Sequence, residues 1–290
     1  MLNITDRRFS NSSTLGENRV NMLPGGSAAG LSTELLQLAC MEVRGGNRAE
    51  VYRAELPGLH AWVSCRPLQP AKHGGDLYNM TVCNSGSISR VTIADVSGHG
   101  ENVSIVAEHL HDALGEYADY WDQSALIRRL NDGFFKGAVV GKFATAFLLS
   151  QYAATGALAF TNAGHPPPLW YHAALRKWTL LHDLMTDTTE IADLPMGMIP
   201  GTPYRQSAVQ LEPDDLLLLY TDGVNESEDE RGEQLGLDGL LKIAEGLPKI
   251  SAAAAGEALL AAVAQFRGSA PPEDDETIIA LHRHPEPEQL

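Results

Sequence analysis

The sequence predicts an α+β domain in which sheets and helices form separate layers. Short β-rich segments come first, two helical segments follow, and the same order then appears a second time. Because strands and helices do not alternate one by one, the pattern argues against a parallel sheet built from βαβ units. The chain has 290 residues, of which 44% are hydrophobic, and this is enough for a large domain with a sizeable core.

The first group of elements is predicted within residues 61–134. Short β-rich runs stand between Gly, Pro, Asn and Ser residues, and they predict strands at residues 61–65, 77–83 and 91–96. A helix follows from apolar residues spaced by three and four, namely Val103, Val106, Leu110 and Leu114. A second helix is predicted to begin at Ser124 as N-cap, with one apolar face made of Ile127, Leu130 and Phe134.

The second group of elements is predicted within residues 143–281. Strands at residues 143–152 and 157–161 are joined by a hairpin-like connection. Residues 216–221 form a continuous apolar run, which is typical of a strand buried on both faces. Helices are predicted at residues 236–244 and 251–266, and a last strand at residues 277–281.

The chain ends are predicted to lie outside the domain proper, which we place at residues 51–284. Residues 1–50 read as a flexible tail, with linker composition at residues 25–30 and a short helix at residues 31–41. Residues 285–290 read as a C-terminal tail. The N-terminal 50 residues are too few for a sensor domain.

Composition excludes several classes of function. The formal net charge of −16 disfavours binding to nucleic acid or to an anionic membrane surface. The three cysteines, Cys40, Cys65 and Cys83, are not closely spaced, so they predict free thiols and neither a disulfide framework nor a zinc cluster. We expect a cytoplasmic protein, because no signal peptide or membrane-spanning run is visible.

Four aspartates stand at the ends of apolar runs, in short segments that also contain Gly or another Asp: Asp76, Asp95, Asp222 and Asp274. Taken singly, each is typical of a turn or a helix cap. Gathered in one place, such carboxylates repel one another unless a cation binds between them, and an all-oxygen set suits Mg²⁺ or Mn²⁺. Two such ions can activate a water molecule for phosphoryl transfer without a protein nucleophile.

Five motifs occur in an order that resembles a known family: GGDLY at 74–78, ADVSGHG at 94–100, NAGHPP at 162–167, YTDGV at 220–224 and DDET at 274–277. Together they resemble the metal-dependent serine/threonine protein phosphatases of type 2C (PPM family), specifically the bacterial SpoIIE/RsbU-like branch. The resemblance runs from about residue 61 to 281. It implies a four-layer αββα sandwich, in which two antiparallel sheets are flanked by helix pairs.

The resemblance also implies a site with two Mg²⁺ or Mn²⁺ ions. By this likeness Asp95 bridges both metals, Asp76 and the backbone carbonyl of Val96 bind the second, and Asp222 and Asp274 hold the first. Around these ligands we expect Asp275, Gly75 and Gly223.

Three positions depart from the family pattern. Asn79 stands where the branch commonly has a second acid, so we expect a lower metal affinity. Asn225 replaces a usual Thr, with a mild effect expected. His99 lies four residues after Asp95 rather than two, so it is either the general acid for the leaving group or a turn residue. His165 is predicted to shape its loop.

The function implied is a phosphoprotein phosphatase that acts on phosphoserine or phosphothreonine in bacterial partner-switching signalling. Its substrate would be a phosphorylated protein, for example an anti-sigma-factor antagonist of the STAS type, and regulation would use a separate partner or a homodimer formed through the N-terminal helix. One alternative is an inactive phosphatase-like protein that binds a phosphoprotein. Another is a diguanylate cyclase, since residues 74–78 partly resemble its signature. Residues 181–204 are hypothesised to form a flap that selects the substrate.

Overall fold

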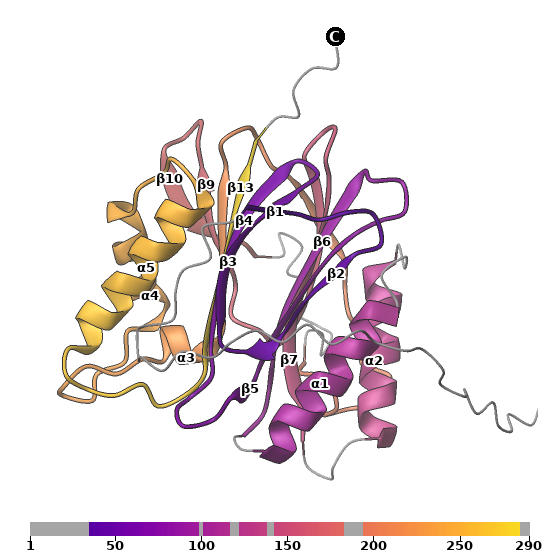
Figure 1. Ribbon diagram of the computed structural model, residues 1–290, viewed down its shortest axis with the longest axis horizontal. Coiled ribbons are helices and arrows are strands. Elements are labelled where there is room, and N and C mark those ends of the chain that lie inside the picture. Colours follow the sequence, from indigo (N-terminus) through magenta and orange to yellow (C-terminus); the bar gives the residue numbers. More distant parts are fainter. Residues whose placement is uncertain (1–34, 99–100, 117–121, 138–141, 183–193, 285–290) are drawn as a thin grey trace, which may run out of the picture. The chain divides into compact units, whose positions relative to one another are not determined.

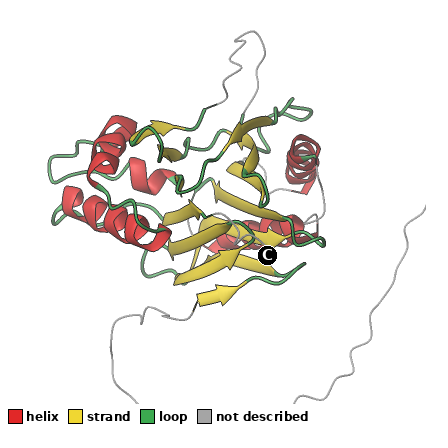
Figure 2. Cartoon of the chain, turned by 90° about the horizontal axis from the view of Figure 1, so that it is seen from above, coloured by secondary structure: helices red, strands yellow, loops and turns green. Residues whose placement is uncertain are grey.

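The computed structural model describes residues 35–98, 101–116, 122–137, 142–182 and 194–284. Two β-sheets pack face to face in this part of the chain, and helices cover the outer face of each sheet (Figure 1). The view from above shows the same order of layers, with helices on both sides of the strands (Figure 2). The predicted α+β class and the four-layer sandwich are therefore confirmed.

One sheet has seven strands. In spatial order they are β1 (Leu35–Gln37), β3 (Glu50–Leu56), β4 (Leu59–Arg66), β13 (Glu276–Arg283), β12 (Leu216–Tyr220), β9 (Leu169–His172) and β10 (Lys177–Leu180). All neighbours pair antiparallel except β1 and β3, which pair parallel. Helices α4 (Gly236–Gly246) and α5 (Ala252–Arg267) cover the outer face of this sheet.

The other sheet has six strands, all antiparallel. Their order is β11 (Ser207–Gln210), β8 (Ala157–Ala163), β7 (Ala144–Tyr152), β6 (Ile88–Val96), β5 (His73–Val82) and β2 (Val43–Arg48). Helices α1 (Glu101–Glu116) and α2 (Gln123–Gly137) pack on its outer face. A single helical turn, α3 (Asp222–Asn225), follows β12 directly.

Three hydrophobic clusters fill the three interfaces between the layers. Because successive side chains of a strand point to opposite faces, a strand that is covered on both sides contributes to two clusters. In β5, Tyr78 faces the other sheet and Leu77 faces α1 and α2. In β12, all five residues are buried, as predicted for a strand covered on both sides. The remaining predicted strands and helices are confirmed within a few residues at their ends.

The predicted helix at residues 31–41 is wrong where the structure describes it. Residues 35–37 form strand β1, and Leu36 packs against the cluster between the sheets. Residues 31–34 lie outside the described residues. Strand β2 also precedes residue 51, so within the described residues the sheet structure starts at Leu35, and the predicted domain boundary at residue 51 is too late. A homodimer formed through this helix therefore loses its structural basis.

The N-cap of α2 is a smaller correction. Asp122, not Ser124, caps the helix: its Oδ1 accepts hydrogen bonds from the Ser124 hydroxyl at 2.7 Å and from the Ala125 backbone N–H at 2.9 Å. These hydrogen bonds lower the pKa of the Asp122 carboxyl.

The thiols agree with the sequence analysis, because Cys40, Cys65 and Cys83 are all free. Among the helices of the described residues, none is long and apolar enough to span a bilayer.

Candidate active site

Two of the predicted aspartates lie side by side in the six-stranded sheet. Asp76 in β5 and Asp95 in β6 are directly opposite each other in the strand register. Both point to the side of the sheet that faces the other sheet, as their alternation with Tyr78 and Ile93 requires. The side chain of Asp76 is buried, since only 2% of this residue is exposed.

The other two aspartates come from the seven-stranded sheet. Asp222 is the first residue of α3, directly after β12, and Asp274 lies two residues before β13. The end of β12 meets the start of β13, because Tyr220 pairs with Ile278 in the antiparallel ladder. The two adjacent strand ends therefore present both carboxylates at one end of the sandwich.

A hydrogen bond connects the two sheets at this end. The Thr221 hydroxyl donates to Oδ2 of Asp76 at 2.7 Å. The same hydroxyl oxygen accepts from the backbone N–H of Thr277 at 3.0 Å, which fixes its orientation. Asp76 is thus positioned by a side chain from the opposite sheet, and sequence analysis did not identify Thr221.

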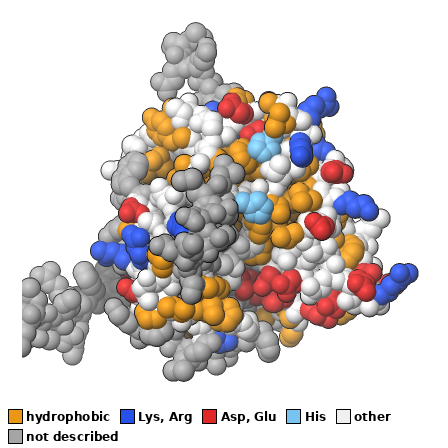
Figure 3. Space-filling view, turned by 180° about the vertical axis from the view of Figure 1, so that it is seen from behind, with side chains coloured by type: hydrophobic (Ala, Val, Ile, Leu, Met, Phe, Trp, Pro, Cys, Tyr) orange, Lys and Arg blue, Asp and Glu red, His pale blue; other side chains and the backbone are white. Residues whose placement is uncertain are grey.

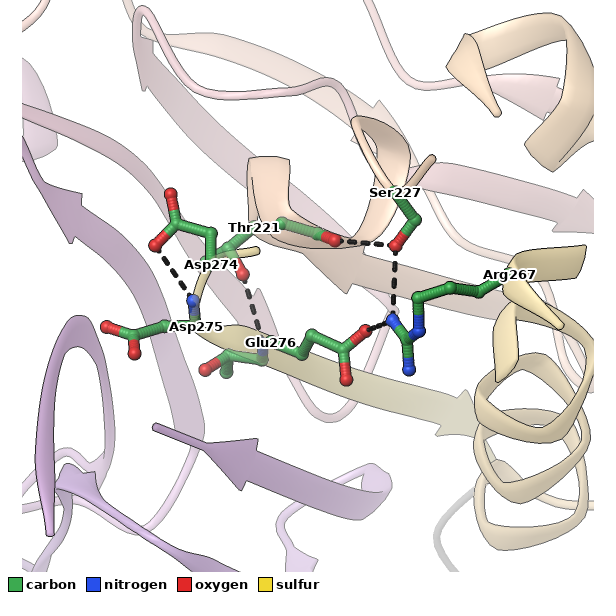
Figure 4. A network of polar contacts seen from close by, with 8 residues as sticks. Thr221, Ser227, Arg267, Asp274, Asp275 and Glu276 are labelled. Atoms are coloured by element: carbon green, nitrogen blue, oxygen red, sulfur yellow. Dashed lines mark hydrogen bonds and ion pairs between the residues drawn. The ribbon is translucent and has the colours of Figure 1, made fainter. Parts of the chain in front are cut away.

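Asp275 joins the sheets a second time. Its Oδ2 accepts from the backbone N–H of Gly75 at 2.6 Å and, more weakly, from that of Asp76 at 3.4 Å. Its Oδ1 accepts from the backbone N–H of Leu68 at 2.6 Å. Asp275 therefore orders the backbone around Asp76, whereas its neighbour Asp274 accepts the backbone N–H of Asp275 at 2.8 Å (Figure 4).

Glycine is required at two positions because the backbones approach closely. A Cβ atom on Gly75 would lie 2.8 Å from the Val96 carbonyl oxygen and 3.3 Å from Oδ1 of Asp95. A Cβ atom on Gly223 would lie 2.0 Å from the backbone carbonyl oxygen of Asp275. The Val96 carbonyl and the Asp95 carboxylate are thus neighbours, as the family resemblance implies.

Burial and mutual repulsion raise the pKa values of several of these carboxyl groups. Burial, followed by the nearby carboxylates of Asp222, Asp274, Asp275 and Glu226 in that order, raises the pKa of Asp95 from 3.8 to about 8. Burial and the charge of Asp95 raise the pKa of Asp76. The pKa of Asp222 is raised as well, first by burial and then by Glu226. Glu226 therefore contributes to the electrostatics of the site as well, although the sequence analysis did not assign it to the site.

The arrangement fits hard divalent cations. Carboxylates and a carbonyl are oxygen donors, and a cation would remove the repulsion that raises these pKa values. Within the described residues, no three of these carboxylates have oxygens that all lie within 4.8 Å of one another. A site with few direct protein ligands per ion suits Mg²⁺, because this ion commonly keeps several bound water molecules. On the face seen in Figure 3, acidic side chains gather in one patch, in line with the net charge of −16.

A cavity of about 190 Å³ adjoins Asp274 and Gly223. Acidic side chains dominate its rim, with Glu226, Glu228 and Glu273 among the lining residues. The basic side chain in its wall, Arg267, forms an ion pair with Glu276 (Figure 4). The cavity therefore presents negative charge next to the candidate metal ligands.

The predictions for Asn79, His99 and His165 have different outcomes. Asn79 pairs with Thr92 on the helix-covered face of the six-stranded sheet, opposite to the face of Asp76, so the expectation that it lowers metal affinity has no structural basis. His99 lies outside the described residues. His165 is 4% exposed, and burial lowers its pKa to about 3. Its ring shares a hydrogen bond with the Thr145 hydroxyl of β7 at 2.8 Å. The side chain of Asn162 accepts from the backbone N–H of His165 and donates to its carbonyl oxygen.

Comparison with known proteins agrees with this geometry. The family model described as stage II sporulation protein E (SpoIIE) matches residues 86–284. The phosphoserine phosphatase RsbP of Bacillus subtilis is 28% identical over 155 residues, which cover 52% of this chain and 36% of RsbP. The chain spans less than half the length of the curated relatives it matches.

Solved structures share the fold. The RsbU and RsbW domains of a Mycobacterium tuberculosis protein superpose with a TM-score of 0.66 at 23% identity, covering 83% of this chain and 64% of that one. RsbX, solved in complex with magnesium, superposes with a TM-score of 0.59 at 15% identity, covering 81% of this chain and all of RsbX. At these identities the likeness shows a common fold.

Proposed function

The chain belongs to the SpoIIE family, and on that premise we propose that it is a metal-dependent phosphoprotein phosphatase acting on phosphoserine or phosphothreonine. The observation that carries the proposal is the gathering of Asp76, Asp95, Asp222 and Asp274 at one end of the sandwich, where burial and mutual repulsion raise the pKa values of the first three. The similarity to RsbP, named as a phosphoserine phosphatase, supports it.

We assign the ligands of two Mg²⁺ or Mn²⁺ ions as the family resemblance implies. Asp95 would contact both ions, Asp76 and the Val96 carbonyl one of them, and Asp222 with Asp274 the other. When bound, such ions supply a water of lowered pKa and neutralise charge on the phosphate oxygens.

The chain's own residues position these ligands. Thr221 and Asp275 hold the β5 segment at Asp76, and the close approaches at Gly75 and Gly223 keep the backbone near the carboxylates. No protein nucleophile is required. His99 remains the candidate general acid that protonates the leaving hydroxyl oxygen. The cavity beside Asp274 would receive part of the substrate chain next to the phosphorylated residue.

The substrate we propose is a phosphorylated protein of a bacterial partner-switching system, such as an anti-sigma-factor antagonist of the STAS type, in the cytoplasm. The solved relative that joins RsbU and RsbW domains supports this setting. Residues 181–204 remain the candidate determinant of substrate choice, and residues 183–193 of this segment lie outside the described residues.

A catalytically inactive binder of a phosphoprotein is the main alternative. All four expected aspartates are present, which favours turnover. The deciding experiment measures phosphate release from a phosphoserine protein with Mn²⁺, with and without a chelator. Release that depends on Mn²⁺ supports the phosphatase, whereas tight binding of the phosphoprotein with no release supports the alternative.

A further inference from the structure

A second group of potential metal ligands lies at the other end of the seven-stranded sheet. Glu55 near the end of β3, His60 near the start of β4 and His284 just after β13 bring their ligand atoms within 4.8 Å of one another. In the candidate active site, Asp274 precedes the first residue of β13, whereas in this group His284 follows the last residue of the same strand. Eight strand residues separate the two places by about 26 Å.

Strand pairing places these side chains on one face. Glu55 is directly opposite His60 in the β3–β4 hairpin, and His60 is directly opposite His282 in β13. The inward positions next to them, Leu56 and Leu59, belong to the cluster between the sheets, so Glu55 and His60 point outward. Because alternate residues share a face, His284 joins them on that side.

The contacts within the group are short and the group is reachable from solvent. Nε2 of His60 lies 3.6 Å from Oε1 of Glu55, and their side chains are 40% and 32% exposed. The rings of His60 and His284 have centroids 3.9 Å apart. Donor atoms around a tetrahedral Zn²⁺ with bonds of about 2.1 Å are roughly 3.4 Å apart. Small side-chain rotations would therefore bring all three donors onto one ion.

The neighbours hold the donors in the state that binds a metal. The Gln37 side chain donates to Oε2 of Glu55 at 3.0 Å, which leaves Oε1 directed at His60 and lowers the pKa of the carboxyl. Burial and the nearby His284 lower the pKa of His60. His282 lies 3.5 Å from Asp214, which draws it away from the group.

We propose that Glu55, His60 and His284 form a binding site for a borderline divalent transition-metal ion such as Zn²⁺, separate from the carboxylate centre. Two imidazoles and one carboxylate suit Zn²⁺, Co²⁺ or Ni²⁺ far better than Mg²⁺, and water would complete the coordination. The bound ion would tie the β3–β4 hairpin to the end of the last strand. It would therefore stabilise the folded chain.

The test measures Zn²⁺ binding to the full chain by calorimetry, after treatment with a chelator and in excess Mg²⁺, which competes at the carboxylate centre. We expect one Zn²⁺ ion per chain, and at least a tenfold weaker affinity in His60→Asn and in His284→Asn. Co²⁺ in place of Zn²⁺ should give an absorption band in the visible region that both variants lose. His109→Asn, an exposed position on α1, is the matched control and should bind as the unchanged chain does.

Melting curves show that the variants are folded, and Zn²⁺ should raise the melting temperature of the unchanged chain and the control only. The proposal is overturned if the His60→Asn/His284→Asn double variant binds Zn²⁺ with unchanged affinity, or if the unchanged chain binds none in excess Mg²⁺. Mn²⁺-dependent phosphate release should be the same in His60→Asn as in the unchanged chain. A loss of phosphatase activity in all proteins would count against the proposed function and leave the zinc result standing.

Discussion

The hydroxyl of Thr221 donates a hydrogen bond to the carboxylate of Asp76, and this bond crosses from one sheet to the other. Asp76 is buried, and its pKa is raised. The hydrogen bond from Thr221 is one of the contacts that orient its carboxylate. Thr221 also accepts the backbone N–H of Thr277. A single hydroxyl therefore links the predicted metal ligand to the start of the last strand.

Thr221→Val tests this link. The substitution keeps the shape of the side chain but removes the hydrogen bond to Asp76 and leaves the Thr277 N–H unpaired. We expect metal affinity to fall about 10- to 100-fold, as for other groups that orient metal ligands. The free energy of unfolding should fall by about 1–3 kcal/mol. Titration with Mn²⁺ and denaturant unfolding measure the two effects. Thr221→Ser keeps the hydroxyl and should retain most of the affinity, and an equal loss in both variants would contradict this role.

Asp274 and Asp275 are adjacent in sequence but are predicted to have opposite roles. Asp275 accepts backbone N–H groups from Leu68 and Gly75. Asp275→Ala leaves these donors unpaired and should cost about 2–4 kcal/mol of stability, together with loss of activity. Asp274→Ala should abolish phosphate release while changing stability by less than about 1 kcal/mol. Equal effects of the two variants on the unfolding free energy would count against this division.

Gly256 in α5 packs directly on a tryptophan. A Cβ atom at this position would lie 2.2 Å from Cε3 of Trp62, which is 1% exposed. Gly256→Ala should therefore destabilise the chain by about 1–3 kcal/mol, because the overpacking outweighs the gain in helix propensity. The matched control is Gly133→Ala in α2, where nothing lies within 4 Å of the new Cβ atom. That variant should be more stable by up to about 1 kcal/mol. Thermal unfolding of both variants distinguishes the two effects.

Several strands with strong β propensity were predicted from the sequence, although β9 (LWYH) was not, and the strands that depend on their partners were not predicted either. Strand β2 has the sequence VRGGNR, which carries no β signal. It is nevertheless a strand, because Gly45 allows close contact with the Tyr78 carbonyl oxygen of β5. The LLQ segment of β1 fits a helical pattern, and its pairing with β3 decides the outcome.

The candidate site divides in the same way. Its aspartates stand at the ends of apolar runs within recognisable motifs, so they could be found by reading along the chain. Thr221 could not be identified, since its role depends on a contact with Asp76, 145 residues away. Asn79 stands three residues after Asp76, and an odd separation within one strand places two side chains on opposite faces. The predicted strand began at residue 77, so it did not include Asp76, which the structure places within β5.

Asp95 predicts how stability depends on pH in protein treated with a chelator. Its pKa rises from 3.8 to about 8 on folding, so the folded chain binds the proton more tightly than the unfolded chain. This contribution to stability is fully present below pH 3.8 and is lost as the pH rises through about 8.

Asp95→Asn removes this titration, and comparison with the unchanged chain cancels the titration of groups away from the site. The substitution also lowers the pKa of Asp76, because the charge of Asp95 raises it in the unchanged chain. The variant should gain stability relative to the unchanged chain as the pH rises from 5 to 8, by up to about 1.4 kcal/mol per pH unit. Denaturant unfolding at several pH values measures the difference. Mn²⁺ should stabilise the unchanged chain more than the variant, because the ion replaces the proton between the carboxylates. A pH-independent difference would show that Asp95 is ionised in the folded chain without a metal, and the electrostatic argument for the cation site would then fail.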